Sequence, residues 1–85
     1  MVTPESIRTS IAAALDCRHL DVRGDGHHWE AVIVSPAFEG LSRIRRHQLV
    51  YAALGDRMRE EIHALSMTTL APAEWAASND PGNST

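Results

Sequence analysis

The chain has 85 residues, of which 44% are hydrophobic, and a net charge of −3 at pH 7. This hydrophobic fraction is typical of a folded protein and too high for a disordered one, and the length suits one small domain. The negative charge argues against a protein whose main ligand is nucleic acid, because such proteins carry a basic field. The single cysteine, Cys17, excludes an internal disulfide and a zinc site of paired cysteines.

The chain also shows no sign of a membrane or secretory destination. No apolar run approaches the ~20 residues that a membrane-spanning helix needs. The first residues lack the charged, apolar and cleavage regions of a secretory signal. We therefore expect a cytoplasmic protein with no membrane partner.

The first predicted element is a helix that begins after Thr3. Thr3-Pro4-Glu5 supplies a hydroxyl N-cap, a proline at the first helical position and an acid that favours the helix dipole. The helix is expected to end near Asp16. Its buried stripe is predicted from apolar residues at helical spacing, namely Ile7, Ile11, Ala14 and Leu15.

A β-hairpin is predicted next, over residues 19 to 35. Leu20-Asp21-Val22 alternates apolar and polar residues, as a half-buried strand does, and residues 29 to 34 have strong strand composition. Gly24-Asp25-Gly26 between them is a turn signal, which we attribute to the positive φ that glycine adopts without steric cost.

A loop from Pro36 to Gly40, which carries Phe38, leads to a second helix that Ser42 is predicted to cap. The apolar positions that mark its expected buried face are Ile44, Leu49, Val50, Ala53 and Leu54. Gly55-Asp56 ends this helix, and Asp56 is a suitable cap for a short third helix over residues 57–61.

The third strand is predicted from Ile62 to Leu70, because this segment is β-branched, rich in threonine and partly alternating. Its two-residue period places His63, Leu65 and Met67 on one face and the residues between them on the other. Residues 71–75 predict a short last helix. Turn-forming residues follow, so we expect one domain over residues 1–77 and a disordered tail over 78–85.

The predicted order is α-β-β-α-α-β-α, which gives an α/β (α+β) fold with a three-stranded sheet covered by helices on one face. At this point the chain resembles the BolA family, in several motifs that agree in order and spacing and span about 75 residues, the size of one small domain. They are Gly24-Asp25-Gly26, His28-Trp29, Val34-Ser35, Phe38-Glu39-Gly40, Arg46-His47, Val50-Tyr51, Ile62-His63-Ala64-Leu65-Ser66 and Pro72-Ala73-Glu74-Trp75. The compact hairpin loop is most similar to the short-loop bacterial IbaG-like subgroup.

The resemblance implies a class II KH-like fold and a non-enzymatic adaptor that works with a monothiol glutaredoxin, often through a shared [2Fe-2S] cluster. It implies that His63 is a cluster ligand and that the second ligand comes from the hairpin loop, where His28 fits the motif better than His27. Imidazole is a good donor to iron. A structural, hydrogen-bonded histidine at a strand end is the alternative for His63.

Only one of the two hairpin histidines is expected to face the cluster, because strand alternation would place them on opposite faces. Cys17 lies outside the hairpin loop and is expected to be a small buried hydrophobe. Since a cluster normally needs four ligands, the remaining donors are expected from the partner, as a glutaredoxin cysteine and glutathione.

A DNA-binding transcriptional regulator is the second hypothesis, a role also associated with this family. Its support is a basic patch on the second helix, formed by Arg43, Arg45, Arg46 and His47. The arginines crowd the positive end of the helix dipole, which favours an external anion or an acidic partner surface. A solvated helix face is the alternative. The family's Arg-His-Arg becomes Arg46-His47-Gln48 here, which removes one basic group.

Two further roles are not expected. The helix break offers only Gly55 and no Gly-x-x-Gly loop, so KH-type RNA binding lacks support. No nucleophile and base pair, phosphate-binding glycine loop or acid pair is recognisable, so an enzyme is not expected. Self-association as a weak homodimer stays open.

Overall fold

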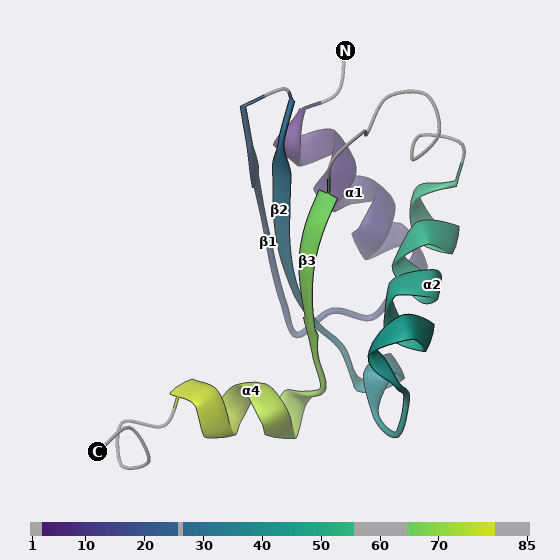
Figure 1. The fold of residues 1–85 in the computed structure, drawn as a ribbon, viewed down its shortest axis with the longest axis vertical. Helices are drawn as coiled ribbons and strands as arrows, with labels where there is room; N and C mark the ends of the chain where they lie inside the picture. Colours follow the sequence, from purple (N-terminus) through teal and green to yellow (C-terminus); the bar gives the residue numbers. More distant parts are fainter. Residues whose placement is uncertain (1–2, 26, 56–64, 80–85) are drawn as a thin grey trace.

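The computed structural model describes residues 3–25, 27–55 and 65–79. Figure 1 shows two helices packed against one face of a sheet, and a last helix that leads away from them. The elements are α1 (Pro4–Ala14), β1 (His19–Gly24), β2 (Trp29–Val34), the 3-10 turn η1 (Pro36–Phe38), α2 (Arg43–Leu54), β3 (Leu65–Leu70) and α4 (Pro72–Asn79).

Among the described residues, the sheet has three strands in the order β1-β2-β3. β1 and β2 are antiparallel, with His19 opposite Val34 and Gly24 opposite Trp29, which confirms the predicted hairpin. β2 and β3 are parallel, with Trp29 opposite Leu65. A parallel pair needs a crossover connection, and α2 lies within it. The α+β class is confirmed.

The core lies between the sheet and the two helices α1 and α2. It consists of Ile7, Ile11, Trp29, Ala31, Ile33, Phe38, Val50 and Leu54. The predicted cap residues stand where the helices begin: Thr3 accepts a hydrogen bond from the Ser6 N–H, and Ser42 accepts one from the Arg45 N–H. The helical spacing of apolar residues correctly predicted the buried residues Ile7, Ile11, Val50 and Leu54. Ala14, at the last residue of α1, is exposed.

Ile44 was expected in the core, and that prediction is wrong, because its side chain is 71% exposed. Val50 and Leu54 mark the buried face of α2, and at about 100° per residue Ile44 lies roughly 100° around the helix from the middle of that pair. It therefore lies beside the buried face, at the surface.

Gly24 also has a different role from the predicted one. It is not among the described glycines with positive φ, and it lies within β1. A Cβ at this position would overlap the ring of Trp29, which lies against the glycine across the hairpin. Gly24 is therefore required for a close approach of the Trp29 ring.

α4 leaves the end of β3 and points away from α1 and α2 (Figure 1). Its Trp75 stacks on His19, with ring centroids 5.0 Å apart. Leu20 and Val22 pack against the core, so His19 lies on the opposite face of β1. The helix runs to Asn79, two residues past the predicted end of the domain.

Some predictions fall outside the described residues, namely the short helix over 57–61, the first residues of the third strand with His63, and the tail from 80 onward. Within the described part of β3, Leu65 and Met67 pack against the core while Ser66 is exposed, so the predicted alternation is confirmed there. None of the helices that the structure describes is long and apolar enough to cross a membrane.

Candidate functional site

The hairpin loop presents His27 and His28 to solvent at one end of the sheet, and both are exposed. Asp25 organises this loop, because its Oδ1 accepts hydrogen bonds from the backbone N–H of His27 and of His28, each 2.8 Å long. The Asp25 N–H in turn donates to the His28 carbonyl at 3.2 Å. Sequence reasoning identified the turn but not this role, although an aspartate two residues before a loop N–H is a known turn signal.

Neither hairpin histidine lies within β2, which begins at Trp29. The expectation that strand alternation separates their side chains therefore does not hold, because the alternation begins only after them. The β2–β3 register brings the start of β3 beside the end of this loop, since Trp29 pairs with Leu65. His63, two positions before Leu65 in the sequence, lies outside the described residues.

Cys17 lies at the other end of β1 from the hairpin loop. A six-residue strand separates the two ends, a span of about 20 Å. Cys17 is partly buried against the core, and burial followed by the charge of Asp16 raises the pKa of its thiol. In the described ranges, no three His, Cys, Asp or Glu side chains gather as a metal would require.

We predict that Asp25→Ala loosens the hairpin loop without unfolding the protein. The amides of His27 and His28 lose their acceptor, so their hydrogen exchange should accelerate, measured by two-dimensional NMR. Asp21→Ala is the matched control, because Asp21 is a half-buried acid of the same hairpin that pairs with Arg23 instead. Equal acceleration in both variants would contradict the assigned role.

The stability of the same loop should fall in acid. Hydrogen bonds from the His28 and then the His27 N–H hold the pKa of Asp25 below its ordinary value. The carboxylate therefore stabilises the loop fully above its ordinary pKa, and this contribution is lost as pH falls through the lowered one.

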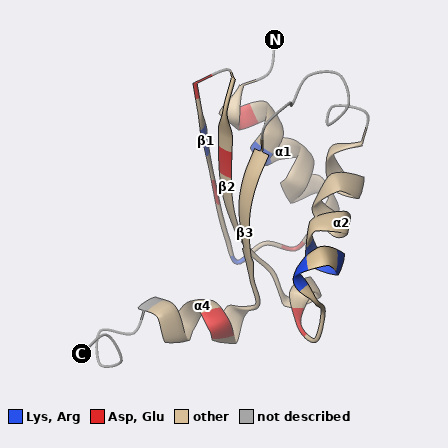
Figure 2. Cartoon of the chain, viewed as in Figure 1, with Lys and Arg blue, Asp and Glu red and all other residues tan. Residues whose placement is uncertain are grey.

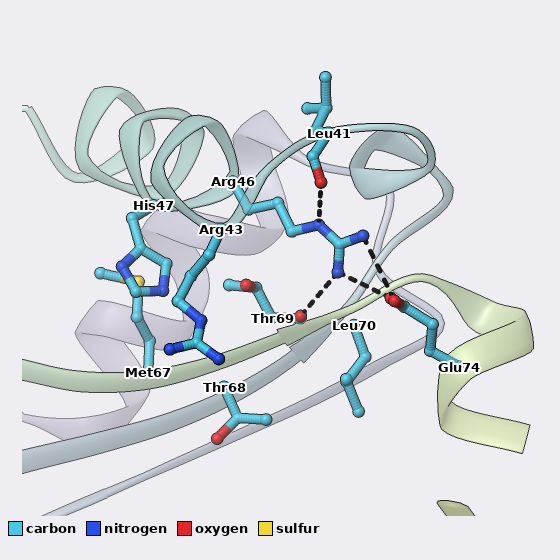
Figure 3. Close-up of a pocket in the computed structure, with 9 residues that line it drawn as sticks. All are labelled: Leu41, Arg43, Arg46, His47, Met67, Thr68, Thr69, Leu70 and Glu74. Atoms are coloured by element: carbon cyan, nitrogen blue, oxygen red, sulfur yellow. Dashed lines mark hydrogen bonds and ion pairs between the residues drawn. The ribbon is translucent and has the colours of Figure 1, made fainter. Parts of the chain in front are cut away.

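A second candidate site is the basic start of α2. Figure 2 shows the blue of the basic residues in the first turns of this helix. Arg43 and Arg45 are exposed, and the guanidinium of neither forms a hydrogen bond or ion pair with another described residue. Together with Met67 and Thr68 of β3, Arg43 and His47 line a groove of about 590 Å³ (Figure 3). The groove lies between α2 and the end of β3.

Arg46, also predicted to contact a partner, is committed to internal contacts. Its Nε donates to the Leu41 carbonyl at 2.9 Å, and its Nη1 donates to the Thr69 carbonyl at 3.0 Å and to Glu74 at 2.7 Å (Figure 3). The Arg46 side chain is 12% exposed. Arg46 therefore ties the loop before α2, β3 and α4 together. Sequence reasoning missed Glu74, because no local pattern joins residues 28 positions apart.

We predict that Arg46→Gln lowers the free energy of unfolding by about 2 kcal/mol, because two backbone carbonyls lose their donor. Urea denaturation would measure the change. Arg45→Gln removes the same charge from an exposed position and should change stability by less than about 0.5 kcal/mol.

The contact between Arg46 and Glu74 also depends on pH. The hydrogen bond from the Arg46 side chain, and after it the one from the Ala71 N–H, hold the pKa of Glu74 below its ordinary value. The stabilisation from the Arg46–Glu74 contact is therefore fully present above the ordinary pKa of Glu74, and it is lost as pH falls through the lowered pKa.

The family model described as BolA-like protein matches residues 2–74. The chain belongs to the BolA family. It is 37% identical over 71 residues to the acid stress protein IbaG of Escherichia coli K12, with 82% of this chain and 84% of IbaG covered. The crystal structure of a Bol-like protein from Babesia bovis superposes with a TM-score of 0.83 at 34% identity, covering 93% of this chain and 95% of that one.

Longer relatives match over part of their length. The chain covers 59% of BolA-like protein 1 of Bos taurus, at 38% identity over 80 residues, which is 82% of this chain. It covers 60% of the DNA-binding transcriptional regulator BolA of Haemophilus influenzae, at 37% identity over 62 residues, which is 73% of this chain. None of these names describes an enzyme. The family model and these relatives confirm the predicted family.

Proposed function

We propose that this protein is a non-enzymatic adaptor that binds a monothiol glutaredoxin and takes part in holding or passing on a [2Fe-2S] cluster. One observation carries the proposal. The β2–β3 register pairs Trp29, which follows His28 directly, with Leu65, which follows His63 by two positions. Adjacent strands lie about 4.8 Å apart, so Trp29 and Leu65, which follow the predicted ligands in the sequence, lie side by side.

The donor set of the chain fits a shared cluster. The exposed imidazoles of His27 and His28 can bind iron when neutral, and Asp25 fixes the backbone that carries them. Cys17 is disfavoured as a ligand by its raised thiol pKa and by its place at the far end of β1. The sulfur donors would therefore be a glutaredoxin cysteine and glutathione. The cluster is cargo in this scheme, and the chain contributes nitrogen ligands.

Mixing the purified protein with a cluster-loaded monothiol glutaredoxin tests the proposal. We expect a changed visible absorption and circular dichroism spectrum, and a complex that elutes with iron and labile sulfide. Cys17→Ser should leave both results unchanged. Cluster-free glutaredoxin measures how much of the association depends on the cluster. An unchanged spectrum together with no complex would refute the proposal.

DNA binding by the start of α2 is the second candidate function, which the exposed Arg43 and Arg45 favour. With Arg46 engaged internally, two arginines of the described start of α2 are available, so contacts by this patch alone should give a slope of log affinity against log salt no steeper than about −2. A salt titration with duplex DNA measures this slope. A flat response would argue against the role.

A further inference from the structure

β1 forms an open edge of the sheet. In the part of the chain that the structure describes, β2 pairs with one side of β1 and no strand pairs with the other. In Figure 1 β1 is the outer strand, and α1 and α2 do not extend past it. Its pairing with β2 continues without a bulge from His19 to Gly24, and the strand contains no proline. Bulges and prolines are features that keep a strand edge from pairing with another chain, so β1 is suited to such pairing.

The main-chain groups that face this edge belong to alternate residues of β1. The Asp25 N–H donates to the carbonyl of His28, its partner across the hairpin, at 3.2 Å. In an antiparallel ladder, hydrogen-bonded and non-hydrogen-bonded residue pairs alternate. Arg23 and Asp21 therefore direct their N–H and C=O groups toward β2. The residues whose N–H and C=O groups face outward are Leu20, Val22 and Gly24.

The core-facing side chains of β1 are incompletely covered at this edge. Leu20 and Val22 pack against the core but are only half-buried. Their partners on β2, Ile33 and Ala31, are buried. A further strand beside β1 would remove more of the Leu20 and Val22 surface from water, which is favourable.

The opposite face of β1 carries two opposite charges, two positions apart. The Arg23 Nε lies 3.0 Å from the Asp21 Oδ2, and the two side chains are 77% and 42% exposed. If a second copy of β1 pairs antiparallel with Val22 opposite Val22, Asp21 of each copy lies opposite Arg23 of the other. In this register the outward main-chain groups also meet one another. A shift by two residues would instead place like charges opposite each other, which is unfavourable.

We propose that two copies of this chain associate through their β1 edges, with Val22 opposite Val22, and so join the described strands of both copies into one continuous sheet. The crossed Asp21–Arg23 pairs favour a second copy over an unrelated strand and select this register. The net charge of −3 on each copy opposes association through other faces. The contact is small, so we expect a weak dimer whose fraction rises with protein concentration. The proposal rests on β1 and does not depend on the cluster.

Analytical ultracentrifugation of the full chain at rising concentration tests the proposal, and we expect a monomer–dimer equilibrium. Asp21→Arg and Arg23→Asp each place like charges opposite each other, so each should weaken self-association about tenfold. An equimolar mixture of these two variants should associate about as well as the unchanged chain, because every introduced charge then faces an opposite one. Arg45→Asp is the matched control, since it makes the same change of charge at an exposed position on α2, and it should leave self-association within about twofold.

An isotope-filtered nuclear Overhauser experiment on a mixture of labelled and unlabelled chain tests the register. Residues of a non-hydrogen-bonded antiparallel pair have Cα atoms about 4.5 Å apart, so we expect a contact between the Hα of Asp21 in one copy and the Hα of Arg23 in the other. Two-dimensional NMR of each dilute variant checks that the fold is retained.

Several outcomes would refute the proposed dimer. A chain that stays monomeric at every concentration would do so, as would intermolecular contacts confined to residues outside β1. An equal loss of association in Arg45→Asp and Arg23→Asp would indicate a diffuse charge effect instead. A mixture of the two β1 variants that stays monomeric would show that the crossed charge pairs do not form. The cluster-loaded glutaredoxin assay does not enter these outcomes, so the two proposals fail separately.

Discussion

Replacing His63 with alanine is expected to abolish the spectral change that this protein produces with a cluster-loaded monothiol glutaredoxin. The expectation follows from the proposed role of His63 as a direct ligand. Losing a residue that merely orients a metal ligand costs about 10- to 100-fold in affinity, so the loss of a ligand should cost more. Titration of the cluster-loaded partner, followed by visible circular dichroism, measures the change.

His63→Cys separates lost ligation from lost structure. A thiolate can also bind iron, so this variant should keep a complex with a different spectrum, whereas alanine should not. His28→Ala and His27→Ala form a matched pair of exposed loop substitutions. The family motif predicts a large loss for the first and a small one for the second. A wild-type spectrum from His63→Ala would show that the cluster is held without this imidazole.

Local signals in the sequence predicted the elements well, because caps and turns act over a few residues. Thr3 and Ser42 cap the helices they were expected to cap, and the hairpin has the predicted bounds to within a residue. The prediction that Ile44 is buried was wrong because the apolar pattern of α2 included it, although the fully buried residues of this helix are Val50 and Leu54. A pattern gives the period of a helix more reliably than the edge of its buried face.

The sites were predictable only in part. His27 and His28 were recognised, but the N–H acceptor that holds their loop, Asp25, was not. The basic patch was recognised as a unit, yet Arg46 differs in role from Arg43 because of Glu74, a residue in another element. That distinction depends on tertiary contacts between α2, β3 and α4. Sequence spacing does not contain them.

Gly24→Ala should lower the free energy of unfolding by about 3 kcal/mol. The new Cβ would occupy the space of the Trp29 ring, which is 3% exposed and belongs to the core. Either the core becomes overpacked or the indole is displaced into water, and both changes cost several kcal/mol at most sites. Urea denaturation measures the loss. Tryptophan emission in a Trp75→Phe background should shift to the red if the Trp29 ring becomes exposed.

A double-mutant cycle isolates the cause, because the clash needs the ring. In a Trp29→Val background, Gly24→Ala should cost less than about 1 kcal/mol, which leaves a coupling energy of about 2 kcal/mol between the two positions. Gly40→Ala adds a comparison of a different kind, since Gly40 has φ 76° and no atom within 4 Å of the added Cβ. Its cost should come from the backbone, at about 1 kcal/mol. If Gly24→Ala cost the same with and without the indole, the glycine would be required for its backbone after all, and the hairpin that carries His27 and His28 would owe its shape to something other than the Trp29 contact.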